Sequence, residues 1–169
     1  MAKPLANGYP IGAVMLRDTI APTMTAGRKG VFLVSKDDLI LFFQGTHGTT
    51  FGGSPMACAV GHHVLSRLSS PSFATHISDV SKHLDSRLKL LPEWFPALLH
   101  GDVRGRGLIR ALAFKDDKHP AQVMQLARER GVFVLTAGKD ALRLVPPLTV
   151  SKEEVDIAMD VLEGSLASL

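Results

Sequence analysis

The spacing of the apolar residues changes at Pro55, and this change constrains the fold more than any other feature of the chain. Up to that point apolar residues occur in short runs among glycine, threonine and proline, as in strands joined by loops. After Pro55 they recur every three or four residues, which predicts amphipathic helices over about 56–68 and 73–91. Ser54 and Pro55 are expected to cap the first helix, and Pro92 to end the second.

From about residue 100 onward the pattern alternates between short strands and helices. Strands are predicted over 108–114, 132–135 and 142–145, and a helix over 120–130 with Gly131 after its end. A last helix is expected to start at Ser151, with Glu154 completing a capping box. This part of the chain is therefore expected to fold as a compact β-α-β-β-α unit.

Three shorter apolar runs precede Pro55. Residues 9–16 have the composition of a buried strand, and 31–34 and 39–43 form a second strand-like pair separated by the turn sequence 35–38. The fold class predicted for the whole chain is α/β.

Composition excludes several classes of protein. The 169 residues are 46% hydrophobic and 21% charged, as in a soluble globular protein, and no apolar run is long enough to span a membrane. Cys58 is the single cysteine, which excludes an internal disulfide framework and a cysteine-rich zinc site. The histidines lack metal-ligand spacing, so no metal is expected, and the first residues do not have the pattern of a signal or transit peptide. The net charge of +3 is scattered rather than clustered with aromatic residues, so no nucleic-acid partner is expected.

Two glycine-rich segments could carry chemistry. Lys3 precedes a Gly/Pro-rich turn and an apolar run, an arrangement that can hold an amine where desolvation makes it nucleophilic toward an aldehyde. The alternative is a surface lysine near a frayed terminus. Residues 45–55 combine hydroxyls and glycines just before a helix, which suits an anion such as phosphate. A glycine-rich connector is the other interpretation of that segment.

Arginines mark two further segments, 103–108 and 142–148. Arg143 stands inside a short apolar strand, where its charge is costly unless it meets a carboxylate, and it is therefore a candidate carboxylate clamp. An arginine extending to solvent from an edge strand is the alternative. Arg104 and Arg106 are expected to have structural roles.

Taken together, these four segments resemble one known family. The run 2–13, the run 47–55 followed by Ala57-Cys58-Ala59, and the runs 104–108 and 143–148 are similar to motifs of the class III pyridoxal-phosphate (PLP) aminotransferases, in particular the acetylornithine/ornithine group. The resemblance covers nearly the whole chain and implies the C-terminal part of a fold-type-I PLP-dependent transferase. Residues 1–70 would be the end of the large PLP-binding domain with a connecting helix, and 71–169 the small domain.

The resemblance also implies roles for particular residues. Lys3 would form the Schiff base with the cofactor, Thr50 would bind the cofactor phosphate of the neighbouring subunit, Thr49 would lie beside the substrate, and Arg143 would receive the substrate carboxylate. The implied reaction moves the amino group of N-acetylornithine to 2-oxoglutarate in a homodimer. Eukaryotic members imply the mitochondrial matrix, with the cytoplasm as the alternative. Ornithine, 4-aminobutyrate and succinylornithine remain alternative donors. A non-catalytic fragment or mis-spliced gene product, and a basic binding module, are the alternatives to the enzyme.

The chain also differs from the family pattern. Family members are longer, with the equivalent of Lys3 near their middle, so the upstream phosphate loop, ring-stacking aromatic residue and pyridine-pairing aspartate have no counterpart here. For that reason the isolated chain is expected to bind the cofactor weakly and to show no turnover. Residues 28–45 are an additional stretch that the family pattern lacks. There are two hypotheses for it: a translated intron, or a genuine hairpin inserted at the dimer interface. The apolar run of such a hairpin would be exposed unless a partner covered it.

Overall fold

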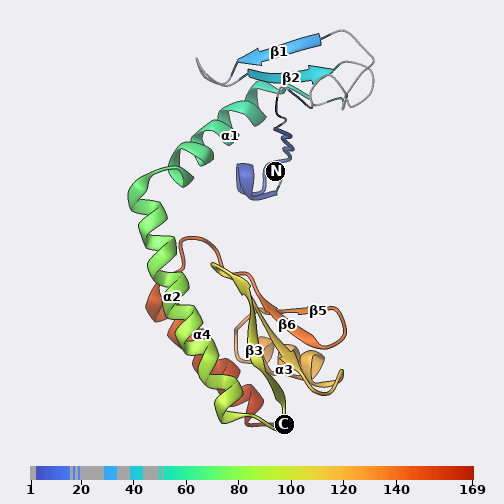
Figure 1. Ribbon diagram of the computed structural model, residues 1–169, viewed down its shortest axis with the longest axis vertical. Coiled ribbons are helices and arrows are strands. Elements are labelled where there is room, and N and C mark those ends of the chain that lie inside the picture. Colours follow the sequence, from blue (N-terminus) through green and yellow to red (C-terminus); the bar gives the residue numbers. More distant parts are fainter. Residues whose placement is uncertain are drawn as a thin grey trace. The chain divides into compact units, whose positions relative to one another are not determined.

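A computed structural model of the chain describes residues 3–15, 17, 19, 29–33, 39–43, 50 and 52–169 (Figure 1). The chain divides into two compact units, Met1–Ser70 and Pro71–Leu169, called here the first and the second unit.

The first unit contains a short 3₁₀ helix, a strand pair and one long helix. The 3₁₀ helix η1 spans Lys3–Ala6, and the strands β1 (Lys29–Leu33) and β2 (Leu39–Phe43) pair antiparallel from Lys29 opposite Phe43 to Leu33 opposite Leu39. Helix α1 spans Pro55–Leu68. The predicted strand pair and the predicted first helix are thus confirmed. Whether the stretch 28–45 is a translated intron stays an untested hypothesis.

Two details of the first unit differ from the predictions. Ser54 occupies the N-cap position of α1, but its side chain makes no capping hydrogen bond, so only the first-turn proline acts as expected. The prediction of a buried strand over 9–16 is wrong within the described residues 9–15, where Gly12 makes only a single-residue bridge. Val14 and Met15 are 65% and 70% exposed. A buried strand needs a neighbouring strand along its length, and among the described residues 9–15 only Gly12 has the geometry of a strand pair.

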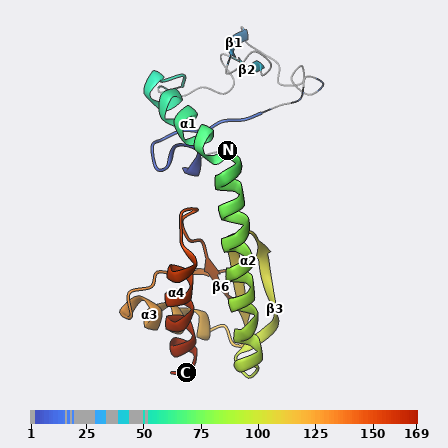
Figure 2. The same ribbon diagram turned by 90° about the vertical axis from the view of Figure 1, so that its left-hand side faces the viewer.

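The second unit is built on a four-stranded antiparallel sheet. Its strands are β3 (Leu99–Arg106), β4 (Ile109–Phe114), β5 (Leu135–Ala137) and β6 (Ala141–Leu144), in the order β3-β4-β6-β5. Three helices accompany the sheet: α2 (Pro71–Trp94), α3 (His119–Glu129) and α4 (Lys152–Leu166). Helices α2 and α4 run side by side (Figure 2).

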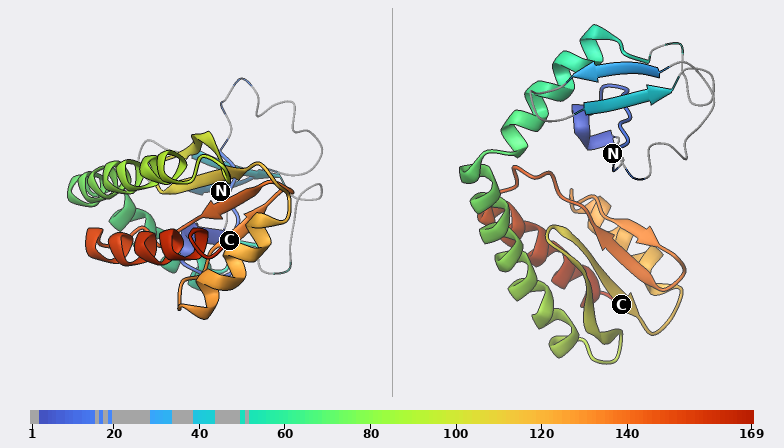
Figure 3. Two further views of the ribbon diagram at one scale, coloured as in Figure 1. Left: turned by 90° about the horizontal axis from the view of Figure 1, so that it is seen from below. Right: turned by 45° about the horizontal axis from the view of Figure 1, so that its top comes forward.

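The helices cover one face of the sheet. Val103, Leu112 and Leu142 are register partners across β3, β4 and β6, and they pack in one apolar cluster with residues of all three helices. Leu112 and Leu142 are 1% and 0% exposed. Arg110, two residues before Leu112, lies on the same face and reaches α2, where its Nη1 lies 2.9 Å from Asp85 Oδ1. The other face carries the alternate residues of each strand and is not covered by these helices; we call it the open face (Figure 3).

Most predicted elements of the second unit are confirmed, and three are corrected. Strand β3 was not predicted, because its sequence is polar and contains two glycines, as befits an edge strand that is mostly exposed. Helix α2 runs on to Trp94 with Pro92 buried in its last turn, where the missing N–H costs a single hydrogen bond. The strand expected over 132–135 starts only at Leu135. The capping box of Ser151 with Glu154 and the positive φ of Gly131 after α3 are as predicted.

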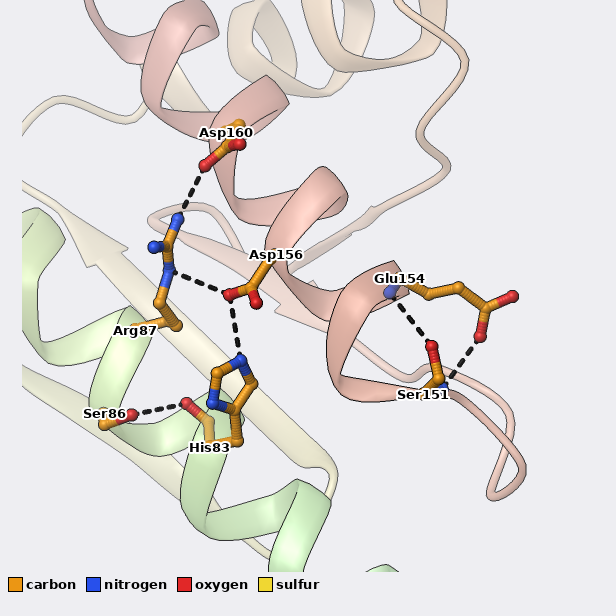
Figure 4. A network of polar contacts seen from close by, with 7 residues as sticks. All are labelled: His83, Ser86, Arg87, Ser151, Glu154, Asp156 and Asp160. Atoms are coloured by element: carbon orange, nitrogen blue, oxygen red, sulfur yellow. Dashed lines mark hydrogen bonds and ion pairs between the residues drawn. The ribbon is translucent and has the colours of Figure 1, made fainter.

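A polar network joins α2 to α4 (Figure 4). His83 Nε2 lies 2.9 Å from Asp156 Oδ1, and Arg87 Nε lies 3.4 Å from the same oxygen. Arg87 also donates through Nη2 to Asp160 Oδ1 at 2.6 Å. Asp156 therefore has two partners on α2, whereas Asp160, the more exposed of the two carboxylates, has one.

This difference predicts an order of effects for the two carboxylates. Asp156→Ala is expected to lower the free energy of unfolding by about 1 kcal/mol, and Asp160→Ala by at most about 0.5 kcal/mol, because exposed ion pairs contribute little. Urea denaturation of the full chain measures both. Equal effects, or a larger effect for Asp160→Ala, would show that the contacts of Asp156 do not join the helices.

Candidate functional site

The segment that carries Lys3 is held by its own backbone and by a buried alanine. Lys3 is the first residue of η1, and the N–H of Tyr9 donates to the carbonyl of Ala6 at 3.1 Å to close the turn that follows. Ala6 is 2% exposed, and Asn7 and Gly8 have positive φ values of 50° and 99°. The backbone therefore turns directly after η1, the short helix that begins with the lysine. The side chain of Lys3 lies outside the described part of the structure.

Helix α1 supports this turn. Segment η1 packs on α1, and Ile11 approaches the helix at Gly61, where an added Cβ would lie only 2.9 Å from Ile11 Cδ1. Gly61 is itself buried, so the absence of a side chain allows the close approach. Position 3 is thus tied to α1 through the buried residues that follow it.

The glycine-rich segment leads into the start of the same helix. Thr50 is exposed in a turn, and Gly53 has a φ of 74° directly before Ser54, the N-cap residue of α1. The first backbone N–H groups of a helix favour anions, and no described residue of the first unit is acidic. These features suit a phosphate group. Thr49 falls outside the described residues, so its predicted place beside the substrate remains a prediction.

Arg143 lies on the open face of the sheet in the second unit. It is exposed, and its register partners are Ala111 on β4 and Leu135 on β5. Strand β6 runs between β4 and β5, so the alternative of an arginine on an edge strand is wrong. No carboxylate among the described residues lies within ion-pair distance of Arg143. The guanidinium group is therefore available to a carboxylate ligand, and its exposure avoids the cost of burying a charge.

Arg104 also lies on the open face, opposite Ala111. Its Nη1 is 3.6 Å from Asp140 Oδ2, and the two side chains are 58% and 43% exposed. Sequence reasoning did not identify Asp140, since a single aspartate in a turn gives no signal of its partner. Within the described ranges no group of three or more His, Cys, Asp or Glu side chains could hold a metal ion, and none of the helices found there is long and apolar enough to cross a membrane.

Comparison with known proteins identifies the family. The model of the class III aminotransferases matches residues 1–166. The chain belongs to this family. Acetylornithine aminotransferase of Yarrowia lipolytica, named mitochondrial, is 36% identical over 98% of the chain and 35% of its own length. The mitochondrial enzyme of the same name from Saccharomyces cerevisiae is 31% identical over 99% of the chain and 35% of its own length.

Solved aminotransferases have the same fold. N-acetylornithine aminotransferase from Stenotrophomonas maltophilia matches with a TM-score of 0.60 and 32% identity, over 68% of this chain and 31% of that chain. Lysine aminotransferase from M. tuberculosis matches with a TM-score of 0.60 and 29% identity, over 66% of this chain and 25% of that one. The predicted family and the predicted fold, that of the C-terminal part of a fold-type-I PLP-dependent transferase, are confirmed. The chain spans about a third of the length of these curated relatives.

Proposed function

We propose that the protein carrying this chain is a PLP-dependent aminotransferase that moves the amino group of N-acetylornithine to 2-oxoglutarate, forming N-acetylglutamate semialdehyde and glutamate. The observation that carries the proposal is the position of Lys3, at the start of a turn anchored on α1 in a chain of the class III aminotransferase family. The acetylornithine aminotransferases among the relatives support this choice of substrate.

The described residues fit PLP in two respects. A lysine in an anchored turn suits the aldehyde, and the exposed segment around Thr50 at the start of α1 suits the phosphate. When bound, PLP supplies an electron sink for the amino-acid carbon that loses its proton. Lys3 would hold the cofactor between reactions, and its free Nζ amine would take the proton from the substrate carbon that bears the amino group.

Arg143 would orient both substrates. Its guanidinium group offers a planar pair of donors to a carboxylate, and it is exposed and unpaired among the described residues. One arginine could therefore bind the carboxylate of the amino donor and then that of 2-oxoglutarate. Such binding directs the reacting end of each substrate in the same way and explains how one site serves both half-reactions.

The assembly and location of the protein follow from the same proposal. Thr50 would contact the cofactor phosphate of a partner subunit, with Thr49 beside the substrate, so the active sites would form across a homodimer. The exposure of Thr50 suits such a role. The first unit would be the end of the large domain and the second unit the small domain. The mitochondrial names of the fungal relatives support a location in the mitochondrial matrix.

Donor preference tests the proposal. The protein would be purified from its source with an antibody against the second unit, so that the whole protein is assayed, and glutamate formation from 2-oxoglutarate would be measured with different donors. The kcat/KM for N-acetylornithine is expected to exceed that for ornithine and 4-aminobutyrate by about tenfold or more. A higher kcat/KM for either competitor would overturn the choice of substrate, and no glutamate from any donor would overturn the transamination itself.

A further inference from the structure

The turn that follows η1 is built around the single asparagine of the chain. Asn7 and Gly8 are the two central residues of this turn, which the N–H of Tyr9 closes by donating to the carbonyl of Ala6 at 3.1 Å. Both central residues have positive φ values, 50° and 99°, as a type I′ turn requires, and Asn-Gly is the preferred pair for such a turn. Asparagine suits the left-handed backbone, but it also places a side-chain amide directly before a glycine.

Three features leave this pair open to a reaction between its own atoms. Asn7 and Gly8 are both exposed, and a Cβ added at Gly8 would meet no described atom within 4 Å apart from its neighbours in the chain. Glycine has no side chain that would shield its backbone nitrogen. The hydrogen bond that closes the turn comes from Tyr9, so the N–H of Gly8 is not needed for it.

We propose that Asn7 is a site of spontaneous covalent modification, at which the backbone nitrogen of Gly8 converts the asparagine to isoaspartate and aspartate. The nitrogen attacks the side-chain carbonyl carbon Cγ. Its proton and the side-chain amide group leave together as ammonia, and a five-membered succinimide ring remains. Water then adds to one of the two ring carbonyl carbons, and the bond from that carbon to the ring nitrogen breaks. Addition at Cγ gives aspartate, addition at the backbone carbonyl carbon gives isoaspartate, and nothing is oxidised or reduced.

Isoaspartate changes the turn in two ways. The main chain then runs through the side-chain carbon, so one more atom separates Ala6 from Tyr9, and the hydrogen bond between them must close a longer loop. A carboxylate also appears in a unit whose described residues include no acid. The same turn joins Lys3 in η1 to Ile11, which approaches α1 at Gly61. The modification therefore displaces Lys3 relative to α1. Its effect on activity rests on the proposed function, whereas the modification itself does not.

Ageing of the purified full chain tests the modification without any requirement for turnover. Peptide mass spectrometry would follow Asn7 at neutral and at mildly alkaline pH, with electron-transfer fragmentation to distinguish isoaspartate from aspartate, and a free peptide of residues 4–11 would be aged in parallel. Asn7 is expected to gain the mass that replacement of NH₂ by OH adds, faster at the higher pH because the attacking nitrogen must lose its proton. Its rate is expected to lie within about tenfold of that of the peptide, because an exposed turn closed by one hydrogen bond opens readily. A rate below that range would overturn the proposal.

Two variants at position 7 separate the chemistry from its consequences. Asn7→Gly keeps a residue that readily adopts a positive φ but removes the side-chain amide, so it is expected to form no product. Freshly prepared Asn7→Asp carries the new charge on a main chain of unchanged length, and it therefore reports the effect of the charge alone. Gln44 also precedes a glycine, but its attack would close a larger ring, so it is expected to convert much more slowly than Asn7. Ammonia release from Asn7→Gly at the rate of the unmodified chain would contradict the assignment to Asn7.

The consequence for Lys3 is tested on the whole protein. Its rate of glutamate formation is expected to fall in step with the isoaspartate content of the ageing sample, whereas Asn7→Gly aged in parallel keeps the activity with which it started. Isoaspartate that accumulates without loss of activity, or an equal loss in Asn7→Gly, would overturn the effect on Lys3. A protein that forms no glutamate even when fresh, but converts Asn7 at the expected rate, would reject the proposed function and keep the modification site.

Discussion

Replacing Gly105 by alanine is expected to destabilise the second unit by at least about 4 kcal/mol and to lower its Tm by about 15 °C or more. Gly105 has a φ of +112°, which side chains with a Cβ rarely adopt. An added Cβ would also collide with the backbone carbonyl oxygen of Ile109 and approach the Cα of Arg110 to 3.1 Å. Backbone atoms of the neighbouring strand cannot move aside, so the turn between β3 and β4 would have to open.

Gly107→Ala is the matched control for this prediction. Gly107 lies in the turn that directly follows β3, with a φ of +60°, but the nearest atom to its added Cβ is Ser81 Oγ at 3.9 Å. Placing an alanine in this left-handed backbone conformation costs about 1–2 kcal/mol in itself. The Tm of Gly107→Ala is therefore expected to lie well above the Tm of Gly105→Ala. Thermal unfolding followed by circular dichroism measures both. Similar Tm values for the two variants would contradict the close approach of the strands at Gly105.

Lys3→Ala is expected to reduce transamination by the whole protein by at least about 10³-fold, because no other group would then move the proton of the substrate carbon. Lys29→Ala, at the start of β1, removes a lysine of the same unit and is expected to keep the activity within about twofold of the unmodified protein. The rate of glutamate formation from N-acetylornithine and 2-oxoglutarate measures both variants.

A second measurement distinguishes a chemical role of Lys3 from a structural one. A small primary amine added to Lys3→Ala can carry a proton in place of the missing side chain, so part of the activity is expected to return in proportion to the amine concentration. Full activity of Lys3→Ala without added amine would show that another residue performs the chemistry.

The helices of the chain could be predicted from sequence because their apolar faces recur over several turns. Helices α1, α3 and α4 were predicted nearly to their ends, and α2 was predicted apart from its last turn beyond Pro92. Strand β3 could not be predicted, because an exposed edge strand needs no alternation of apolar and polar residues. The opposite error over 9–16 has the related cause that an apolar run does not reveal whether a partner strand exists.

The candidate site depended on different kinds of information. Arg143 could be identified from its unusual place in an apolar strand. Its place on a central strand, with no ion-pair partner among the residues that the structure describes, could be known only from the sheet order and the contacts. The alignment of Arg104 with Arg143 across Ala111 follows only from the register, since the sequence separates them by 39 positions (143 − 104). Lys3 was one candidate among the residues, but only the family resemblance favoured a chemical role for it, because a lysine before a turn is otherwise common on protein surfaces.

Mapping the lysine that holds the cofactor tests the central claim most directly. The whole protein would be purified with its bound PLP and treated with borohydride, which fixes the cofactor to its lysine. Digestion and mass spectrometry would then locate the label. The expected result is a single labelled lysine, Lys3. A label on another lysine, such as Lys29 or Lys82, or no label in a protein that forms glutamate, would contradict the claim.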